Sequence, residues 1–178
     1  MTQIAGILIA SLLMATISSF NGNGLRNKCR RRRALSLCEA SIICLQETHW
    51  DGESVDEVKK EWRGEVFANN GGERARGVAI LINSGDVQNA RKVEDDGEGR
   101  MIGVQYEYMG DTFKWINVYA PNTKRERRVF FEGLNGKCGG NCLIVGDFNV
   151  WCEKLDAPAG ARFRSDNDRL VFKYDSVG

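Results

Sequence analysis

Short apolar runs and amphipathic segments alternate along the chain from residue 13 onward. The apolar runs predict buried strands, and the segments with apolar residues three or four positions apart predict covering helices. Strands are expected at 13–20, 41–46, 66–69, 78–82, 100–108, 113–119 and 142–145, and helices at 27–39, 54–62, 123–134 and 167–174. This order predicts an α/β (layered α+β) domain.

The segments 100–108 and 113–119 alternate between apolar and polar positions. Such alternation is typical of antiparallel strands with one buried face, and Gly110-Asp111 supplies a turn between them. The buried face is expected to carry Ile102, Val104, Tyr106 and Tyr108 from the first segment and Phe113, Trp115, Asn117 and Tyr119 from the second.

The first predicted helix carries a run of basic residues, 28–33. Asn27 is expected to cap it, with Leu35 and Leu37 facing inward and the arginines facing solvent. A solvated helix face is the favoured interpretation, and contact with a phosphate backbone or a nuclear-import patch stays open. A second basic run, 124–128, is better placed to meet nucleic acid. The acidic cluster 94–98 predicts a turn, with weak Ca²⁺ binding as the alternative.

Composition limits the chain to one ordinary domain. It has 178 residues, 42% of them apolar and 28% charged, only two prolines, and a formal net charge of +1. A net charge this close to zero does not indicate a surface that binds nucleic acid or a membrane. Any binding of phosphate groups would therefore depend on local basic patches. We assign residues 13–178 to the domain and residues 1–12 to an apolar extension of uncertain status.

The apolar run 4–17 raises the question of a targeting segment. It is shorter than the ~20 residues of a membrane-spanning helix, and no Lys or Arg precedes it. A secretory signal normally begins with such a positive region. A buried strand is therefore favoured, with a signal or anchor as the alternative. The expectation is a nuclear or cytoplasmic protein that does not use a membrane.

Six cysteines are spaced irregularly along the chain. This spacing is unlike the framework of a small secreted domain, so we expect reduced thiols. Cys138-Gly-Gly-Asn-Cys142 has the form of half a zinc clamp, which stays as an alternative although no second tight pair accompanies it.

Four polar signatures follow the ends of predicted strands. A carboxylate at the end of a buried strand is costly unless it is paired or bound to a metal. Acids and amides at neighbouring strand ends build an oxygen-lined pocket that suits a hard cation and a phosphate. Each signature alone is also compatible with a simple turn. The four are Asn21-Gly22-Asn23-Gly24-Leu25, Gln46-Glu47-Thr48, Tyr119-Ala120-Pro121-Asn122 and Gly146-Asp147-Phe148-Asn149.

In this order the signatures resemble the endonuclease/exonuclease/phosphatase superfamily, which includes exonuclease III-type abasic-site endonucleases and deoxyribonuclease I. Four sequence motifs are most similar to those of endonucleases encoded by non-LTR retrotransposons. They are Asn-Gly-Leu-Arg, Cys-Leu-Gln-Glu-Thr-His, Asn-Val-Tyr-Ala-Pro-Asn and Ile-Val-Gly-Asp-Phe-Asn. The resemblance covers residues 14–178. It implies two packed mixed β-sheets flanked by helices, a deoxyribonuclease I-like four-layer sandwich, and a Mg²⁺-dependent phosphodiesterase that nicks one DNA strand.

The resemblance also implies roles for individual residues. Glu47 would be the principal ligand of one Mg²⁺, for which Mn²⁺ would substitute, with Asn21 nearby as a further ligand or bonded to substrate. Asp147 would orient or deprotonate the attacking water, and Asn149 would hold Asp147 and the phosphate in line. Tyr119 would direct its phenol at the phosphate. The pocket edge would carry two substrate-binding residues, Asn23 and Asn122.

The implied partner is DNA, bound by a monomer without a small organic cofactor. Abasic-site repair cleavage by an endonuclease or exonuclease, and hydrolysis of a small-molecule phosphoester, are alternatives within the superfamily. A catalytically inactive fragment is an alternative of a different class.

Two departures from the family pattern change these expectations. Gly22 stands where relatives usually place Val or Ile, which is expected to loosen the first strand. The family's final Ser-Asp-His motif is missing, because the single histidine is His49, and Ser165-Asp166-Asn167 follows Asp147 too closely to replace it. We therefore expect a domain without its C-terminal part, an incomplete second sheet with an exposed edge, a tendency to aggregate, and little catalysis.

Overall fold

The computed structural model describes residues 8–12, 15–72, 75–83, 85 and 87–150. The chain divides into two compact units, Met1–Phe148 and Asn149–Gly178. Every helix and strand reported below belongs to the first unit. The helix predicted at 167–174 and the Ser165-Asp166-Asn167 segment lie outside the described residues.

Five strands form the first sheet, in the order β1-β2-β3-β5-β4. β2 and β3 are parallel, and the other neighbouring pairs are antiparallel. The chain passes through α1 between β2 and β3, and through α2 between β3 and β4. The bounds are β1 Leu8–Leu12, β2 Ala15–Asn21, α1 Lys28–Ser36, β3 Ile42–Gln46, α2 Gly52–Glu61, β4 Glu65–Asn69 and β5 Val78–Ile82.

Four strands form the second sheet, in the order β6-β7-β8-β9. The first three are antiparallel neighbours, and β9 lies parallel to β8 after the chain has passed through α3. The bounds are β6 Gln88–Asp95, β7 Met101–Tyr108, β8 Asp111–Tyr119, α3 Lys124–Glu132 and β9 Cys142–Asp147.

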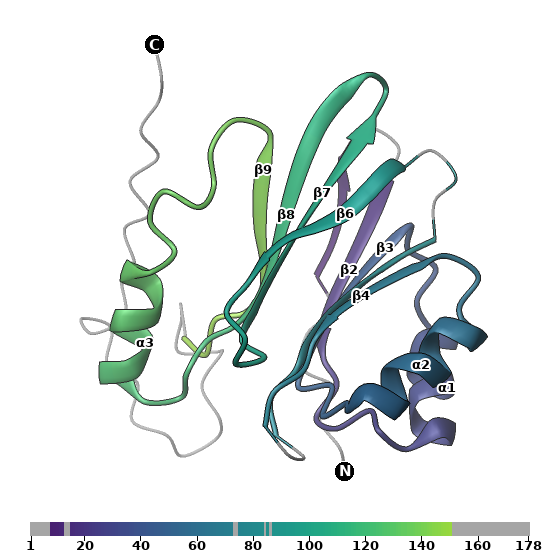
Figure 1. Ribbon diagram of the computed structural model, residues 1–178, viewed down its shortest axis with the longest axis horizontal. Helices are drawn as coiled ribbons and strands as arrows, with labels where there is room; N and C mark the ends of the chain where they lie inside the picture. The colour runs from purple at the N-terminus through teal and green to yellow at the C-terminus, as the bar shows by residue number, and fades with distance from the viewer. Residues whose placement is uncertain (1–7, 13–14, 73–74, 84, 86, 151–178) are drawn as a thin grey trace. The chain divides into compact units, whose positions relative to one another are not determined.

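The elements of the first unit are layered, with α1 and α2 on the first sheet and α3 on the side of the second sheet (Figure 1). The core between the sheets includes the predicted buried face of β7 and β8, which confirms the alternation seen in the sequence. A second core fills the space under α1 and α2. The prediction of two packed mixed sheets flanked by helices is therefore confirmed. In the part of the chain that the structure describes, no helix is long and apolar enough to cross a membrane.

Two strands were not predicted from the sequence. β1 pairs antiparallel with β2, so residues 8–12 of the supposed extension join the sheet. β6 is an edge strand with mostly exposed side chains and an irregular register against β7. It contains the start of the acidic cluster, where Asp95 forms an ion pair with Lys92. A strand with few buried side chains has no apolar alternation for sequence analysis to detect.

The basic run of α1 is not wholly solvated, contrary to the prediction. The side chain of Arg31 is only 1% exposed and lies 2.9 Å from Glu57 Oε2 of α2. Its Nη1 also donates to the carbonyl oxygens of Leu25 (3.4 Å) and Arg26 (3.2 Å). Leu37, expected to face inward, follows the helix and is 70% exposed. Arg31 thus takes the interior position because carbonyl and carboxylate acceptors are present there for its two terminal nitrogens, while its buried Nε has no hydrogen-bond partner among the described residues.

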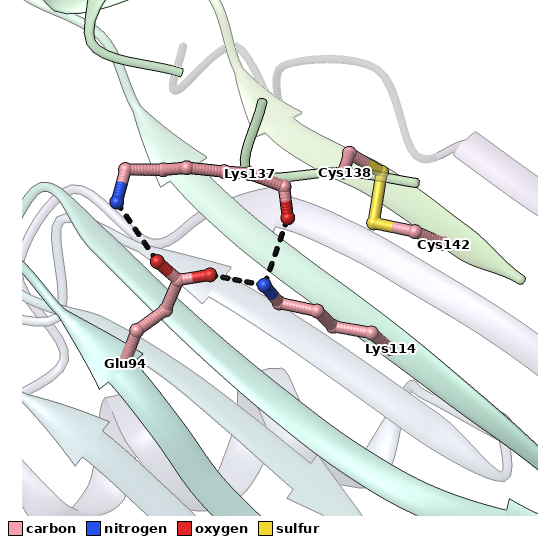
Figure 2. Close-up of a disulfide and its surroundings, with 5 residues drawn as sticks. All are labelled: Glu94, Lys114, Lys137, Cys138 and Cys142. Carbon is pink, nitrogen blue, oxygen red and sulfur yellow. Dashed lines mark hydrogen bonds and ion pairs between the residues drawn. A yellow bond between two sulfur atoms is a disulfide. The ribbon is translucent and has the colours of Figure 1, made fainter. Parts of the chain in front are cut away.

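A disulfide joins Cys138 and Cys142, so the expectation of reduced cysteines is wrong for this pair. The bond closes a short loop directly before β9 and excludes the zinc half-clamp, because both sulfur atoms are used. Figure 2 shows the loop beside an ion cluster in which Glu94 pairs with Lys114 and Lys137. Lys114 Nζ also donates to the carbonyl oxygen of Lys137 (2.8 Å). Three other cysteines, Cys29, Cys38 and Cys44, are free thiols.

Reducing this disulfide is expected to lower the stability of the chain modestly. A cross-link closing so short a loop contributes about 2 kcal/mol by restricting the unfolded chain, which corresponds to roughly 4–8 °C in melting temperature for a domain of this size. Thermal denaturation with and without dithiothreitol measures the shift. The matched control is the double variant Cys138→Ser/Cys142→Ser, whose melting temperature should not respond to the reductant. An equal response in both proteins would show that the reductant acts elsewhere.

Candidate active site

Four strand ends from two different sheets meet at one place in the first unit. In the first sheet, Asn21 ends β2 in register with Gln46, and Glu47 follows directly. In the second sheet, Tyr119 ends β8 in register with Asp147 at the end of β9. The sheets are in contact through β2 and β9 and through β3 and β8. The polar residues that follow these strands are therefore brought to a common edge.

The amide of Asn21 bridges two carboxylates. Its Nδ2 donates to Glu47 Oε1 at 2.9 Å and to Asp147 Oδ2 at 2.8 Å. Its Oδ1 accepts from the backbone N–H of Asn23 at 2.8 Å, which fixes the orientation of the amide. Glu47 and Asp147, which are 100 positions apart in the sequence, are thus held by a single donor group.

Glu47 sits in a loop with a left-handed backbone, at φ 50°. This conformation costs a side-chain-bearing residue about 1–2 kcal/mol. Backbone hydrogen bonds on both sides hold the loop: Gly24 N donates to Glu47 O at 2.8 Å, and Thr48 N donates to Gly77 O at 3.1 Å. A Cβ on Gly77 would lie 2.4 Å from Thr48 Oγ1, so this approach needs glycine. The neighbouring segments thereby impose the position of Glu47.

Gly22 was expected to loosen β2. In the structure the side chain of the buried Leu25 fills the space beside it, and a Cβ there would lie 2.5 Å from Leu25 Cγ. Gly22 N also donates to Gln46 O at 2.8 Å, which continues the pairing of β2 with β3. The glycine thus allows Leu25 to pack under the start of the site.

Tyr119 directs its phenol at Glu47. Burial raises the pKa of Tyr119 to about 12, reinforced by the hydrogen bond to Glu47 and by the negative charges of Glu47 and Asp147. The guanidinium of Arg100, 5.4 Å from the ring centroid, opposes this shift. Tyr119 therefore keeps its proton throughout the neutral range and can act as a hydrogen-bond donor.

Several residues that contact the site have no role predicted from the sequence. The Nε2 of His49 lies 3.6 Å from Glu47 Oε2, and Arg100 covers the ring of Tyr119. Behind Glu47, the buried side chains of Gln46 and Asn117 are joined by a 2.7 Å hydrogen bond. The available signal was an amide in an otherwise apolar buried strand, because such a group must find partners.

Three further residues were predicted for the site: two have exposed side chains, and the third belongs to the second compact unit. The side chain of Asn23 is exposed, and its backbone serves Asn21. The side chain of Asn122 is exposed too, and its carbonyl oxygen accepts from Arg127 at 2.9 Å. Asn149 opens the second compact unit, with φ 51°. The roles predicted for these three side chains stay predictions.

The donor set at this edge suits a hard cation. Among the described residues, no group of three or more His, Cys, Asp or Glu side chains is arranged to hold a metal. Two carboxylates that share one amide donor nevertheless fit Mg²⁺, which keeps several waters and needs only one or two protein carboxylates. Asn21 turns its nitrogen toward the carboxylates. It therefore fits an orienting role better than the predicted role of ligand.

Residues 17–176 match the Endonuclease/Exonuclease/phosphatase family. The chain belongs to this family. A protein described as the Transposon TX1 uncharacterized 149 kDa protein of Xenopus laevis is 33% identical over 149 residues. That match covers 79% of this chain and 11% of the TX1 protein. The resemblance to the endonuclease/exonuclease/phosphatase superfamily and to transposon-encoded proteins is thus confirmed.

Solved structures share the fold. The 3′-5′ exonuclease NExo of Neisseria meningitidis superposes with a TM-score of 0.54 at 20% identity, covering 75% of this chain and 57% of NExo. A substituted form of the Neisseria 3′ phosphatase NExo bound to a product DNA hairpin has the same TM-score and identity, covering 76% of this chain and 58% of the other. An AP endonuclease of Archaeoglobus fulgidus has a TM-score of 0.59 at 19% identity, covering 82% and 62%. The chain spans less than two thirds of each of these relatives.

Membership in the endonuclease/exonuclease/phosphatase family supports a phosphoesterase of the nuclease type. Glu47 and Asp147, the carboxylates that the sequence singled out, lie together at the strand ends, and the roles that the resemblance implies for them stay predictions.

Proposed function

We propose that this chain is a Mg²⁺-dependent DNA endonuclease domain that nicks one strand of a duplex. One observation carries the proposal: Glu47 and Asp147 come from different sheets and are bridged by the Asn21 amide at 2.9 and 2.8 Å. Two carboxylates that share one donor carry like charges, which a bound cation would offset. Such a pair is well suited to a site that receives a dication and a phosphate.

Each residue has a task that follows from its contacts. Glu47 would hold Mg²⁺ through its carboxylate, and Mn²⁺ is expected to substitute. When bound, the ion supplies positive charge that stabilises the phosphate and the leaving oxygen. Asp147 orients the attacking water and accepts its proton at the carboxylate. Asn21 keeps the two carboxylates in place. Tyr119 keeps its proton and hydrogen-bonds to Glu47 in this structure, and its O–H would turn to the phosphate oxygens when substrate is bound.

The remaining predicted residues complete the proposal. Asn149 would align Asp147 with the phosphate, and Asn23 and Asn122 would meet the substrate at the rim. We expect a monomer that needs no organic cofactor and acts in the nucleus or cytoplasm. The 33% identity with the TX1 transposon protein favours an endonuclease of the transposon type. Abasic-site cleavage is the second candidate, because an AP endonuclease shares the fold.

A nicking assay on two substrates tests the function. The chain is incubated with supercoiled plasmid and with a duplex that contains one abasic analogue, in Mg²⁺ or in excess EDTA. The proposal expects slow conversion of plasmid to the open-circular form in Mg²⁺, in keeping with the little catalysis predicted for a chain without the Ser-Asp-His motif, and none in EDTA. Cleavage of the abasic duplex alone would replace it with the repair-type activity. Equal conversion in EDTA would contradict a metal-dependent reaction.

A further inference from the structure

One buried amide connects the two sheets directly behind the candidate active site. Asn117 on β8 is fully buried, with 0% of its surface exposed. Its Nδ2 crosses to the first sheet and donates to Leu45 O of β3 and to Ala79 O of β5, both at 2.9 Å. Its Oδ1 accepts from Gln46 Nε2 at 2.7 Å. The amide therefore makes three hydrogen bonds, all to the opposite sheet.

These bonds reach the two strand ends that carry the Glu47 loop. Leu45 lies two residues before Glu47, and Gln46 is its immediate neighbour. Ala79 is the register partner of Leu45 and lies two residues after Gly77, the residue that holds the far side of the loop. The Asn117 amide is thus bonded both to the end of β3, which leads into the Glu47 loop, and to the start of β5, which follows Gly77.

The same residue also lies next to the second half of the site. Asn117 and Tyr119 are two positions apart in β8, so their side chains project from the same face of the sheet. Tyr119 hydrogen-bonds to Glu47 across the two sheets. Asn117 therefore stands behind the contact between Tyr119 and Glu47, with a connection to each partner's strand.

We propose that Asn117 is a positioning residue that sets the placement of the Glu47 loop relative to Tyr119. The inference rests on the proposed function, because it assumes that Glu47 serves as the metal-binding carboxylate. Asn117 touches no substrate in this role and acts through Leu45, Gln46 and Ala79. Its three hydrogen bonds hold the strand ends in one register across the interface between the sheets.

The chemistry of the position supports a role beyond packing. The neighbours of Asn117 in the core between the sheets are mainly aliphatic and aromatic, so an apolar residue of the same volume would fill the space. An amide in such a place is tolerated only when its groups are paired. Asn117 meets that condition with acceptors and a donor that all lie within two residues of Glu47 or Gly77. The pairing therefore specifies geometry at the site.

The test compares Mn²⁺ affinity of the whole chain with that of Asn117→Leu, measured by electron paramagnetic resonance of the free ion. Leucine has the same number and branching of side-chain heavy atoms, although its methyl groups are bulkier, and it removes all three hydrogen bonds. The expected result is Mn²⁺ binding weakened about 10-fold or more, the range for outer residues that orient metal ligands. The control is Ile116→Ala, which creates a cavity at the neighbouring buried position on the opposite face of β8. It should lower the melting temperature and leave Mn²⁺ affinity unchanged.

A second variant covers the case in which Asn117→Leu does not fold. Gln46→Met removes the bond to Asn117, together with the bonds of Gln46 Nε2 to Ser19 Oγ (3.1 Å) and Cys44 O (3.3 Å), and leaves both carbonyl bonds of Asn117 in place. A folded Gln46→Met chain should bind Mn²⁺ several-fold more weakly than wild type. A folded Asn117→Leu chain with wild-type affinity overturns the proposal, as does failure of both variants to fold, which assigns Asn117 to stability alone. Absence of Mn²⁺ binding by the wild-type chain instead refutes the proposed function, and the inference falls with it.

Discussion

Replacing Glu47 by Gln or Asp147 by Asn is expected to lower the rate of plasmid nicking by roughly 1,000-fold in each case. Both substitutions keep the size and planarity of the side chain and remove one negative charge. The reasons differ between the two positions. Glu47→Gln removes the carboxylate that would hold the ion, and Asp147→Asn removes the group that would accept the proton of the attacking water.

Metal binding separates the two losses. Glu47→Gln should weaken Mn²⁺ binding strongly, whereas Asp147→Asn should retain Mn²⁺ and lose the reaction rate. Initial nicking rates on supercoiled plasmid and a Mn²⁺ titration of each variant provide the comparison. Glu132→Gln is the matched control, because Glu132 is an exposed acid on α3. Nicking that survives in both site variants would refute the assignment of the active site.

Gly146→Ala is expected to destabilise the domain by about 3 kcal/mol. Gly146 has φ 143°, a backbone conformation that side-chain-bearing residues rarely adopt. A Cβ at this position would lie 2.0 Å from the carbonyl oxygen of Val118, its register partner in β8. The collision involves backbone, so β8 and β9 would have to separate at the point where Asp147 leaves the sheet.

Urea denaturation followed by circular dichroism measures this change as a lower midpoint. Gly52→Ala is the control: Gly52 opens α2 with nothing within 4 Å of a built Cβ, so stability should change by less than about 1 kcal/mol. Midpoints that agree between Gly146→Ala and wild type would mean that the two strands lie farther apart than described.

The strands that build the site could be predicted from the sequence because each is an apolar run that ends in a polar signature. β2, β3, β8 and β9 all have this form, and their order in the chain predicts a layered domain. β6 escaped prediction because its exposed, charged side chains leave no alternation, and its pairing with β7 is irregular. Only a strand with a buried face needs apolar residues at regular positions. An exposed edge strand lacks that pattern, so the structure is needed to identify it.

The candidate site likewise has features that the sequence could predict and features that it could not. The motifs identified the carboxylates, and the resemblance to the superfamily assigned their roles. No spacing in the sequence could show that the Asn21 amide points its nitrogen at both of them, since this depends on how β2 packs beside β9. Arg31 and Asn117 share this difficulty. Each is a polar residue whose interior position is stabilised by acceptors from distant segments.

The origin of the four central side chains has a consequence for how activity and folding are linked. Asn21 and Glu47 belong to one sheet, whereas Tyr119 and Asp147 belong to the other. Neither sheet carries the whole proposed site, which is complete only where the two sheets are packed together. If the proposed function is right, a shift of one sheet against the other would abolish activity while each sheet kept its own strand pairing. The nicking rate would then measure the packing of the two sheets rather than the presence of the strands.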